Sequence, residues 1–134
     1  MRKTHLSVRD CAGLAPRLPA GGSWLTPPAM RNGELWISLP TADGAAWLVG
    51  DGFFNIARTP RTPIGALLRL LGISPGLRIG ASYKWFIGDD SAYRQWLLET
   101  IERERPTTLI PCHGDVVTDP QLPSRLRRLV ESRL

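Results

Sequence analysis

The chain has 134 residues, enough for one domain with a hydrophobic core of its own. Its apolar content of 43% and charged content of 22% are those of an ordinary globular protein. No stretch reaches the roughly 18 apolar residues that a membrane span needs, and the basic N-terminus lacks the apolar centre of a signal peptide. Cys11 and Cys112 form no disulfide framework and no CxxC pair, so we expect reduced thiols in the cytoplasm and no membrane partner.

The formal charge of +5 is carried mainly by arginines that are spread along the chain. A local cluster, Arg125, Arg127, Arg128 and Arg133, lies near the C-terminus. A basic helix face of this kind is either an electrostatic footprint for phosphate groups or a solvated surface with a few ion pairs. No nucleic-acid motif accompanies the charge, so we expect the solvated surface and keep nucleic-acid binding as an alternative.

The first half of the chain predicts a β-hairpin after an irregular N-terminal segment, residues 1–30. Residues 33–40 read as a strand with Leu35, Ile37 and Leu39 on one face, and Thr41 to Gly44 supply turn residues. The second strand, 45–50, is apolar on both faces. That pattern is typical of a strand buried between two layers.

The second half predicts helices on either side of one more strand. Pro63 suits the first turn of a helix that Gly72 ends, and extended structure is expected around 84–87. Asp89 or Asp90 is a candidate N-cap for a helix that runs to about residue 105. A strand at 108–110 and a final helix after Asp119 follow, the helix with one apolar face made of Leu122, Leu126, Leu129 and Val130. This order predicts a layered α/β fold.

Two apolar stretches end in the same way, each with a residue that can bind a metal followed by glycine. Leu48-Val-Gly precedes Asp51-Gly52, and Leu109-Ile-Pro-Cys precedes His113-Gly114. Ligands in open α/β sheets bind at the carboxyl ends of strands. Glycine beside a ligand allows close backbone approach and unusual dihedral angles. Each residue alone is ordinary in a turn, but together they predict one edge of a metal-type site.

In these motifs and in Gly33-Glu-Leu-Trp-Ile, the chain resembles the C-terminal half of a metallo-β-lactamase-fold hydrolase over about residues 30–130. The resemblance implies that residues 1–134 form a single domain, half of an αββα sandwich with a mixed sheet covered by helices. It also implies that Asp51 matches the aspartate that bridges two metals and that His113 matches the last histidine ligand.

The family's first metal cluster, His-x-His-x-Asp-His, is absent from this chain, whose only histidines are His5 and His113. The loop before Gly33 also lacks the family's histidine. Since a catalytic zinc takes three protein ligands and keeps an open position, two ligands imply weak or no binding of zinc or iron. His5 could add a ligand only if the N-terminus crosses the site.

Other chemical side chains are expected to have structural roles. Alternation along an extended chain directs Cys112 away from His113 and into the core. Asp115 suits a turn, and Asp89 and Asp90 suit helix caps. Arg58 and Arg61, in the loop after Asp51, either hold an anionic small molecule or are solvated.

A half-sandwich leaves an apolar sheet face that normally marks an interface. We therefore expect a homodimer packed sheet to sheet, with Trp36, Trp47 and Leu48 between the sheets. The favoured function is a non-catalytic binding or scaffolding protein. The first alternative is a metal-dependent hydrolase of ester, thioester, lactone or phosphodiester bonds, whose ligands are completed by a second chain or by a missing N-terminal half. The second is a nucleic-acid binder that uses the C-terminal helix.

Overall fold

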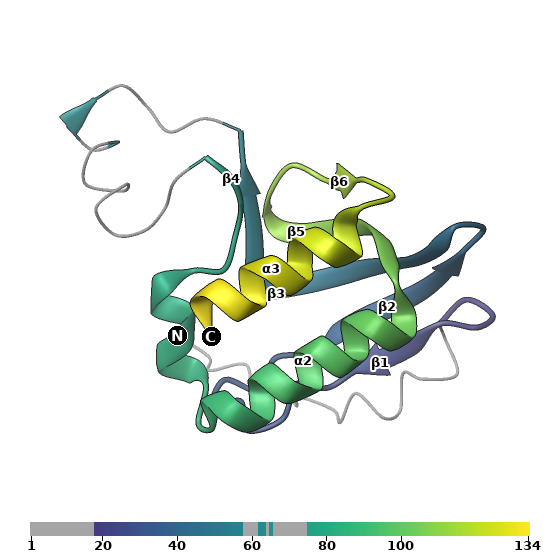
Figure 1. Cartoon of the computed structure of the whole chain (residues 1–134), viewed down its shortest axis with the longest axis horizontal. Helices are drawn as coiled ribbons and strands as arrows, with labels where there is room; N and C mark the ends of the chain where they lie inside the picture. The colour runs from purple at the N-terminus through teal and green to yellow at the C-terminus, as the bar shows by residue number, and fades with distance from the viewer. Residues whose placement is uncertain (1–17, 58–61, 64, 66–74) are drawn as a thin grey trace, which may run out of the picture.

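The computed structural model describes residues 18–57, 62, 63, 65 and 75–134. Six strands, a 3-10 helix and two α-helices make up this part of the chain (Figure 1). In chain order they are β1 (Ser23–Leu25), β2 (Trp36–Thr41), β3 (Gly44–Ile56), β4 (Gly76–Arg78), η2 (Ala81–Phe86), α2 (Asp90–Glu104), β5 (Pro106–Gly114), β6 (Val117–Thr118) and α3 (Leu122–Arg133).

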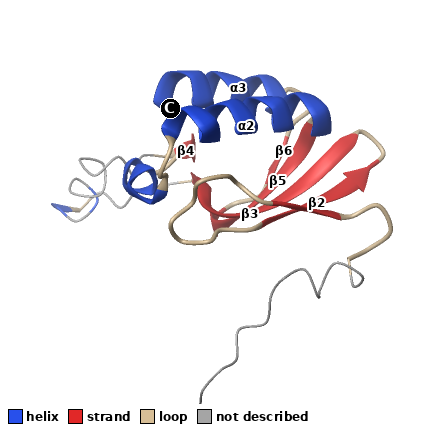
Figure 2. Ribbon diagram, turned by 90° about the horizontal axis from the view of Figure 1, so that it is seen from below, coloured by secondary structure: helices blue, strands red, loops and turns tan. Residues whose placement is uncertain are grey.

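The six strands form one mixed sheet, and the long strand β3 is at its centre. The order is β1-β2-β3-β5-β6, and β4 pairs with the far end of β3. Only β3 and β5 run parallel; the other pairs are antiparallel. Both α2 and α3 lie side by side on the same face of the sheet (Figure 2). The predicted layered α/β arrangement is therefore present as one sheet and one helical layer.

The predicted hairpin is formed by β2 and β3. Thr41 pairs with Gly44 across the turn, and Ile37 pairs with Leu48 farther along the ladder. The face of β2 that packs into the core is that of Trp36 and Ser38, not the face of Leu35, Ile37 and Leu39 that alternation suggested. Ser38 is accommodated there because its hydroxyl donates to the carboxylate of Glu104, 2.7 Å away at the end of α2.

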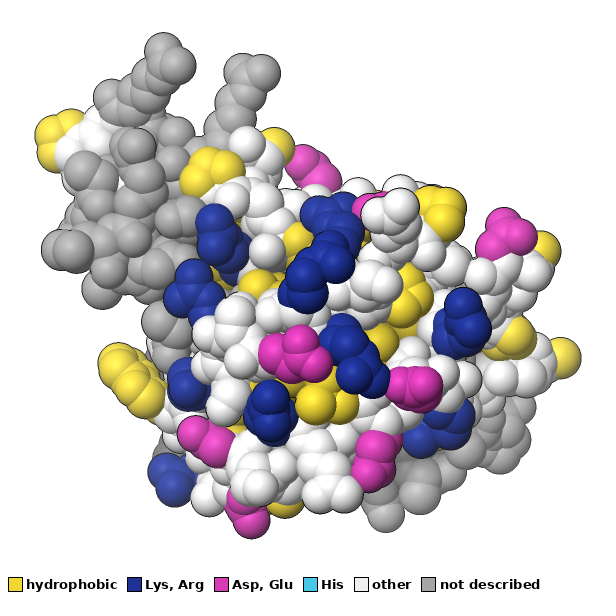
Figure 3. Space-filling view, in the orientation of Figure 1, with side chains coloured by type: hydrophobic (Ala, Val, Ile, Leu, Met, Phe, Trp, Pro, Cys, Tyr) yellow, Lys and Arg dark blue, Asp and Glu magenta, His cyan; other side chains and the backbone are white. Residues whose placement is uncertain are grey.

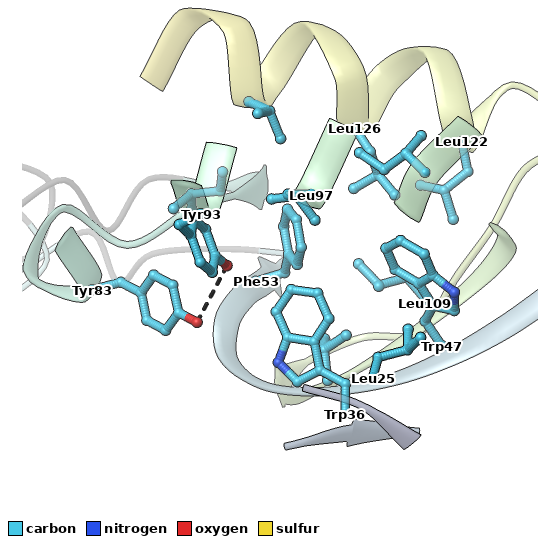
Figure 4. Packing of buried hydrophobic residues seen from close by; sticks show 14 of the residues in the cluster. Leu25, Trp36, Trp47, Phe53, Tyr83, Tyr93, Leu97, Leu109, Leu122 and Leu126 are labelled. Carbon is cyan, nitrogen blue, oxygen red and sulfur yellow. Dashed lines mark hydrogen bonds between the residues drawn. The ribbon is translucent and has the colours of Figure 1, made fainter. Parts of the chain in front are cut away.

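The core lies between the sheet and the two helices (Figure 4). Its centre is aromatic: the rings of Trp36 and Trp47 are 6.0 Å apart, and Phe53 and Trp96 also pack against Trp36 with tilted rings. From the helices, the fully buried aliphatic residues are Leu97, Leu122, Leu126 and Val130. Aromatic pairs at such distances stabilise beyond the area that they bury, by about 0.5–1.5 kcal/mol each.

One helical layer leaves the two faces of β3 in different surroundings. Trp47 and Val49 are buried under the helices, whereas Ala46 and Leu48 on the opposite face are half-buried. The expectation that this strand would be buried on both faces therefore holds only for the face of Trp47 and Val49. Trp36 and Trp47 belong to the core of a single chain, so they cannot lie between two sheets as expected.

Helix α2 begins where the capping residue predicts. The Asp89 carboxylate accepts a hydrogen bond from the Ala92 amide at 3.0 Å, which satisfies one of the free N–H groups of the first turn. The helix ends at Arg105, which adopts a left-handed conformation with φ of 48°. The extended structure expected around 84–87 is present at Ile87, which forms a β-bridge with Met30, whereas Lys84 to Phe86 belong to the 3-10 helix η2.

Several expectations concern residues 1–30 and the segment after Pro63. Within the expected irregular segment 1–30, residues 23–25 form the edge strand β1. The helix expected after Pro63 falls almost entirely outside the described residues; Pro63 and Gly65 are helical. None of the helices in the described part of the chain is long and apolar enough to cross a membrane.

Candidate metal centre

Asp51 projects from an irregularity in β3 rather than from the end of a strand. Val49 pairs with Pro111 of β5, and the next regular partners are Phe54 and His113. Five positions along β3 thus match two along β5, so β3 carries three extra residues at this point. Bulges re-aim side chains and are frequent beside functional sites. Here the bulge takes Asp51 out of the ladder, and its side chain is 60% exposed.

His113 is positioned by the turn that ends β5. Gly114 has a φ of +101°, which favours glycine, and a Cβ at this position would collide with the backbone carbonyl of Asn55. That carbonyl accepts from the Asp115 amide at 2.7 Å, and the Asn55 side-chain amide donates to the Asp115 carbonyl at 3.0 Å. The glycine after the histidine is therefore required by both conformation and space.

The two predicted ligands meet. His113 Nε2 lies 3.1 Å from Asp51 Oδ1, within hydrogen-bonding distance. The imidazole side chain is 68% exposed. The parallel pairing of β3 with β5 places both residues on the same rim of the sheet. The geometric prediction made from the two glycine-flanked strand ends is confirmed.

Cys112 joins this pair, contrary to the expectation of a core position. Its thiol is exposed and donates to Asp51 Oδ1 at 3.4 Å. Residues 112–114 are all exposed, so side chains from both faces of the strand end reach the same rim. Partial burial and the Asp51 carboxylate raise the pKa of the Cys112 thiol. The imidazole here is at hydrogen-bonding distance from Asp51, which also accepts from the thiol.

The donor set fits a zinc-type ion. One imidazole nitrogen, one sulfur and one carboxylate oxygen all lie within 4.8 Å of one another. Ligand atoms around tetrahedral zinc, with bonds of about 2.0–2.3 Å, are roughly 3.3–3.7 Å apart. The distances from Asp51 Oδ1 to the other two atoms, 3.1 and 3.4 Å, are close to that spacing. Three ligands with an open side also match the ligand number of catalytic zinc sites.

The remaining candidate residues lie elsewhere. Asp89 caps α2, Asp90 is its first residue, and Asp115 belongs to the turn after β5. His5, Arg58 and Arg61 are outside the described residues, so the proposed anionic ligand of the two arginines has no described site.

Basic and acidic side chains are interspersed on the face that carries the two helices (Figure 3). Arg125 pairs with Asp119 at 2.7 Å, and Arg127 pairs with Glu102 at 2.7 Å and with Glu131 at 3.8 Å. Exposed pairs of this type contribute little to stability, typically about 0–1 kcal/mol.

A concave site of about 490 Å³ lies at the opposite end of β5 from Asp51, Cys112 and His113, the metal-type cluster. Its lining includes Arg105, Thr107, Thr108 and Thr118. None of its lining residues belongs to the metal-type cluster. The cluster therefore lies apart from this cavity.

Comparisons of the chain with protein-family models, with curated proteins and with solved structures find no match. The resemblance to metallo-β-lactamase-fold hydrolases consequently depends on the residues and geometry of this chain alone.

Proposed function

We propose that this chain binds a thiophilic divalent metal ion of zinc type through Asp51, Cys112 and His113. The convergence of three chemically different ligand atoms within 4.8 Å on one rim supports the proposal most directly. Sulfur and imidazole donors favour zinc, or iron in second place, over magnesium and calcium, which prefer oxygen ligands. The fold proposed to carry the site is half of a metallo-β-lactamase-like sandwich.

The exposure of the site favours binding over catalysis in a single chain. Small-molecule sites usually bury about 70–90% of their ligand. Asp51 and His113 are more than half exposed and offer a substrate few walls. The non-catalytic function therefore remains the first proposal. A hydrolase is the alternative in which another chain adds walls or ligands: a bound zinc lowers the pKa of a water molecule and so supplies hydroxide at neutral pH. Its substrate would be an ester, thioester, lactone or phosphodiester.

Metal content tests the proposal. Protein purified without chelators would be measured by elemental mass spectrometry and titrated with Co²⁺, whose thiolate complexes absorb strongly. We expect one metal per chain and a thiolate-to-cobalt charge-transfer band. Asp51→Ala and His113→Ala should each lose most of the binding, and Cys112→Ser should lose the band. Asp115→Ala is the matched control, because it removes a nearby exposed carboxylate that is not a ligand. Wild-type protein that takes up neither zinc nor cobalt would contradict the proposal.

A homodimer through the open sheet face is the second part of the proposal. Cross-strand partners form a row of Ile37, Leu48 and Ile110, and a second row of Leu39, Ala46 and Thr108 lies beside it. All six side chains are uncharged, although the whole chain has a net charge of +5. No described helix covers this face (Figure 2). Two copies can therefore meet here without bringing their positive charges into direct contact.

Sedimentation equilibrium tests the dimer. We expect a dimer at micromolar concentration, and we expect Ile110→Glu to shift it to monomer. Val116→Glu is the control, because Val116 is an exposed apolar residue between β5 and β6, outside the two rows. A wild-type chain that sediments as a monomer would remove this part of the proposal and leave the metal site untouched.

The compartment and the nucleic-acid alternative also bear on this proposal. A reducing compartment such as the cytoplasm would keep the exposed Cys112 thiol available for a metal. Nucleic-acid binding by α3 is less well supported, since Arg125 and Arg127 are engaged in ion pairs. Binding to generic duplex DNA that falls steeply with salt would be the observation in its favour.

A further inference from the structure

The Glu34 side chain forms a hydrogen bond with the bulge that carries Asp51. Its Oε1 atom accepts the Gly52 amide at 3.1 Å and the Trp36 indole N–H at 2.6 Å. Hydrogen bonds to a carboxylate are shorter and stronger than those between neutral groups. The bond to Gly52 therefore ties the residue next to Asp51 to the beginning of the hairpin.

Both glycines that flank Asp51 lie in close contact with neighbouring side chains. A Cβ on Gly50 would lie 2.8 Å from Glu34 Oε1. A Cβ on Gly52 would lie 2.7 Å from the Trp36 ring and 3.2 Å from the Tyr83 hydroxyl. Gly50 therefore leaves room for the Glu34 carboxylate, and Gly52 leaves room for the two aromatic side chains, while Asp51 between them is exposed.

The surroundings of Glu34 are aromatic and largely closed. The Tyr93 hydroxyl donates to that of Tyr83 at 3.3 Å (Figure 4). Burial, with the nearby Glu34 carboxylate as a lesser cause, raises the pKa of both tyrosines, so both are neutral. The second carboxylate oxygen of Glu34 is buried and has no hydrogen-bond partner among the described residues. Leaving a buried acceptor unpaired costs free energy, whereas Oε1 accepts two hydrogen bonds.

We propose that Glu34 is a positioning residue for the metal site, and that its hydrogen bond to the Gly52 amide sets the bulge that aims Asp51 at Cys112 and His113. The expected effect on metal affinity rests on the proposed function, but the hydrogen bond between Glu34 and the Gly52 amide can be tested without metal. Outer-shell groups that orient metal ligands typically change affinity by about 10–100-fold when they are removed.

Amide hydrogen exchange of the metal-free protein provides the first test. We expect the Gly52 amide to be protected in the wild type, protected in Glu34→Gln, and exposed to exchange in Glu34→Ala. Glutamine keeps an oxygen acceptor of the same reach, so its rescue separates the hydrogen bond from the charge. Val130→Ala controls for general loss of stability, because Val130 is fully buried on α3, on the helical side of the core.

Cobalt affinity provides the second test. Glu34→Ala should bind Co²⁺ about 10–100-fold more weakly than wild type, with an altered charge-transfer band, and Glu34→Gln and Val130→Ala should stay within about threefold. If Glu34→Ala does not fold, Gly50→Ala displaces the same carboxylate while Glu34 is retained, and the same loss is expected.

The outcomes separate this inference from the proposed function. A wild type without cobalt binding but with an acceptor-dependent Gly52 amide overturns the metal site and supports Glu34 as the residue that sets the bulge. Equal Gly52 exchange in the wild type and in Glu34→Ala overturns the role of Glu34. Unchanged cobalt affinity in both Glu34→Ala and Gly50→Ala, or equal losses in Glu34→Ala and Glu34→Gln, also overturns it.

Discussion

Replacement of Gly114 by alanine is the sharpest test of how His113 is placed. Two costs are expected. The backbone stays at a φ of +101°, where an L-residue is strained by about 1–3 kcal/mol. The new Cβ also collides with the Asn55 carbonyl, which must move away from the Asp115 amide. Loss of that hydrogen bond and of the reciprocal one from the Asn55 side chain adds about 1–2 kcal/mol.

Gly76→Ala is the matched control for this variant. Gly76 has a similar φ of +96°, but an added Cβ there meets no described atom within 4 Å. Gly76→Ala is therefore destabilised by the backbone strain alone, without a steric collision. Urea unfolding followed by tryptophan fluorescence should show Gly114→Ala to be less stable than Gly76→Ala by about 1–2 kcal/mol. Cobalt affinity should fall only in Gly114→Ala. Equal stabilities within about 0.5 kcal/mol would refute the close approach of Gly114 to Asn55.

Three further predictions concern the core, the bulge and a surface carboxylate. Leu126→Ala should lower the free energy of unfolding in urea by about 2–5 kcal/mol, because Leu126 is fully buried. Leu129→Ala should lower it clearly less, because Leu129 is half-buried. Gly52→Ala should cost about 1–3 kcal/mol by crowding Trp36, and a wild-type-like stability would contradict that packing. The hydrogen bond from Arg125 lowers the pKa of Asp119, so Asp119 stabilises the fold above its unfolded pKa, and this contribution is lost as the pH falls through its folded pKa. Asp119→Asn should therefore be less stable than wild type at pH 7, and thermal melts should converge in acid; a constant difference would show another cause.

The parts of the fold that follow from local chemistry could be predicted from the sequence. The Thr41–Gly44 turn, the Asp89 cap and the apolar stripe of α3 each depend on neighbours within a few residues. The strands β1, β4 and β6 have only two or three residues, too few for a period to show. Such short strands form because they pair with a neighbouring strand, and that partner cannot be predicted from the local sequence.

Which face of β2 is buried depended on a contact 66 residues away. Alternation on β2 offers two faces, one with Leu35, Ile37 and Leu39, the other with Trp36 and Ser38. Apolar count favours the first face. The second is buried because Trp36 fills the aromatic core and the Ser38 hydroxyl finds Glu104 on α2. A buried hydroxyl is tolerated when it is paired, and only the tertiary structure provides that pair.

The candidate site was predictable for Asp51 and His113 and not for Cys112, for one geometric reason. Alternation holds while a strand stays in a regular ladder, and it assigns Cys112 and His113 to opposite faces. The ladder between β3 and β5 is broken between Val49 and Phe54, opposite Cys112, and it resumes at the pair of Phe54 and His113. Because the bulge brings Asp51 to the rim itself, the carboxylate reaches a thiol and an imidazole that leave the strand in different directions. Gly50-Asp51-Gly52 could have been interpreted as a bulge beside the strand end Cys112-His113-Gly114. That interpretation would have predicted Cys112 as the third ligand.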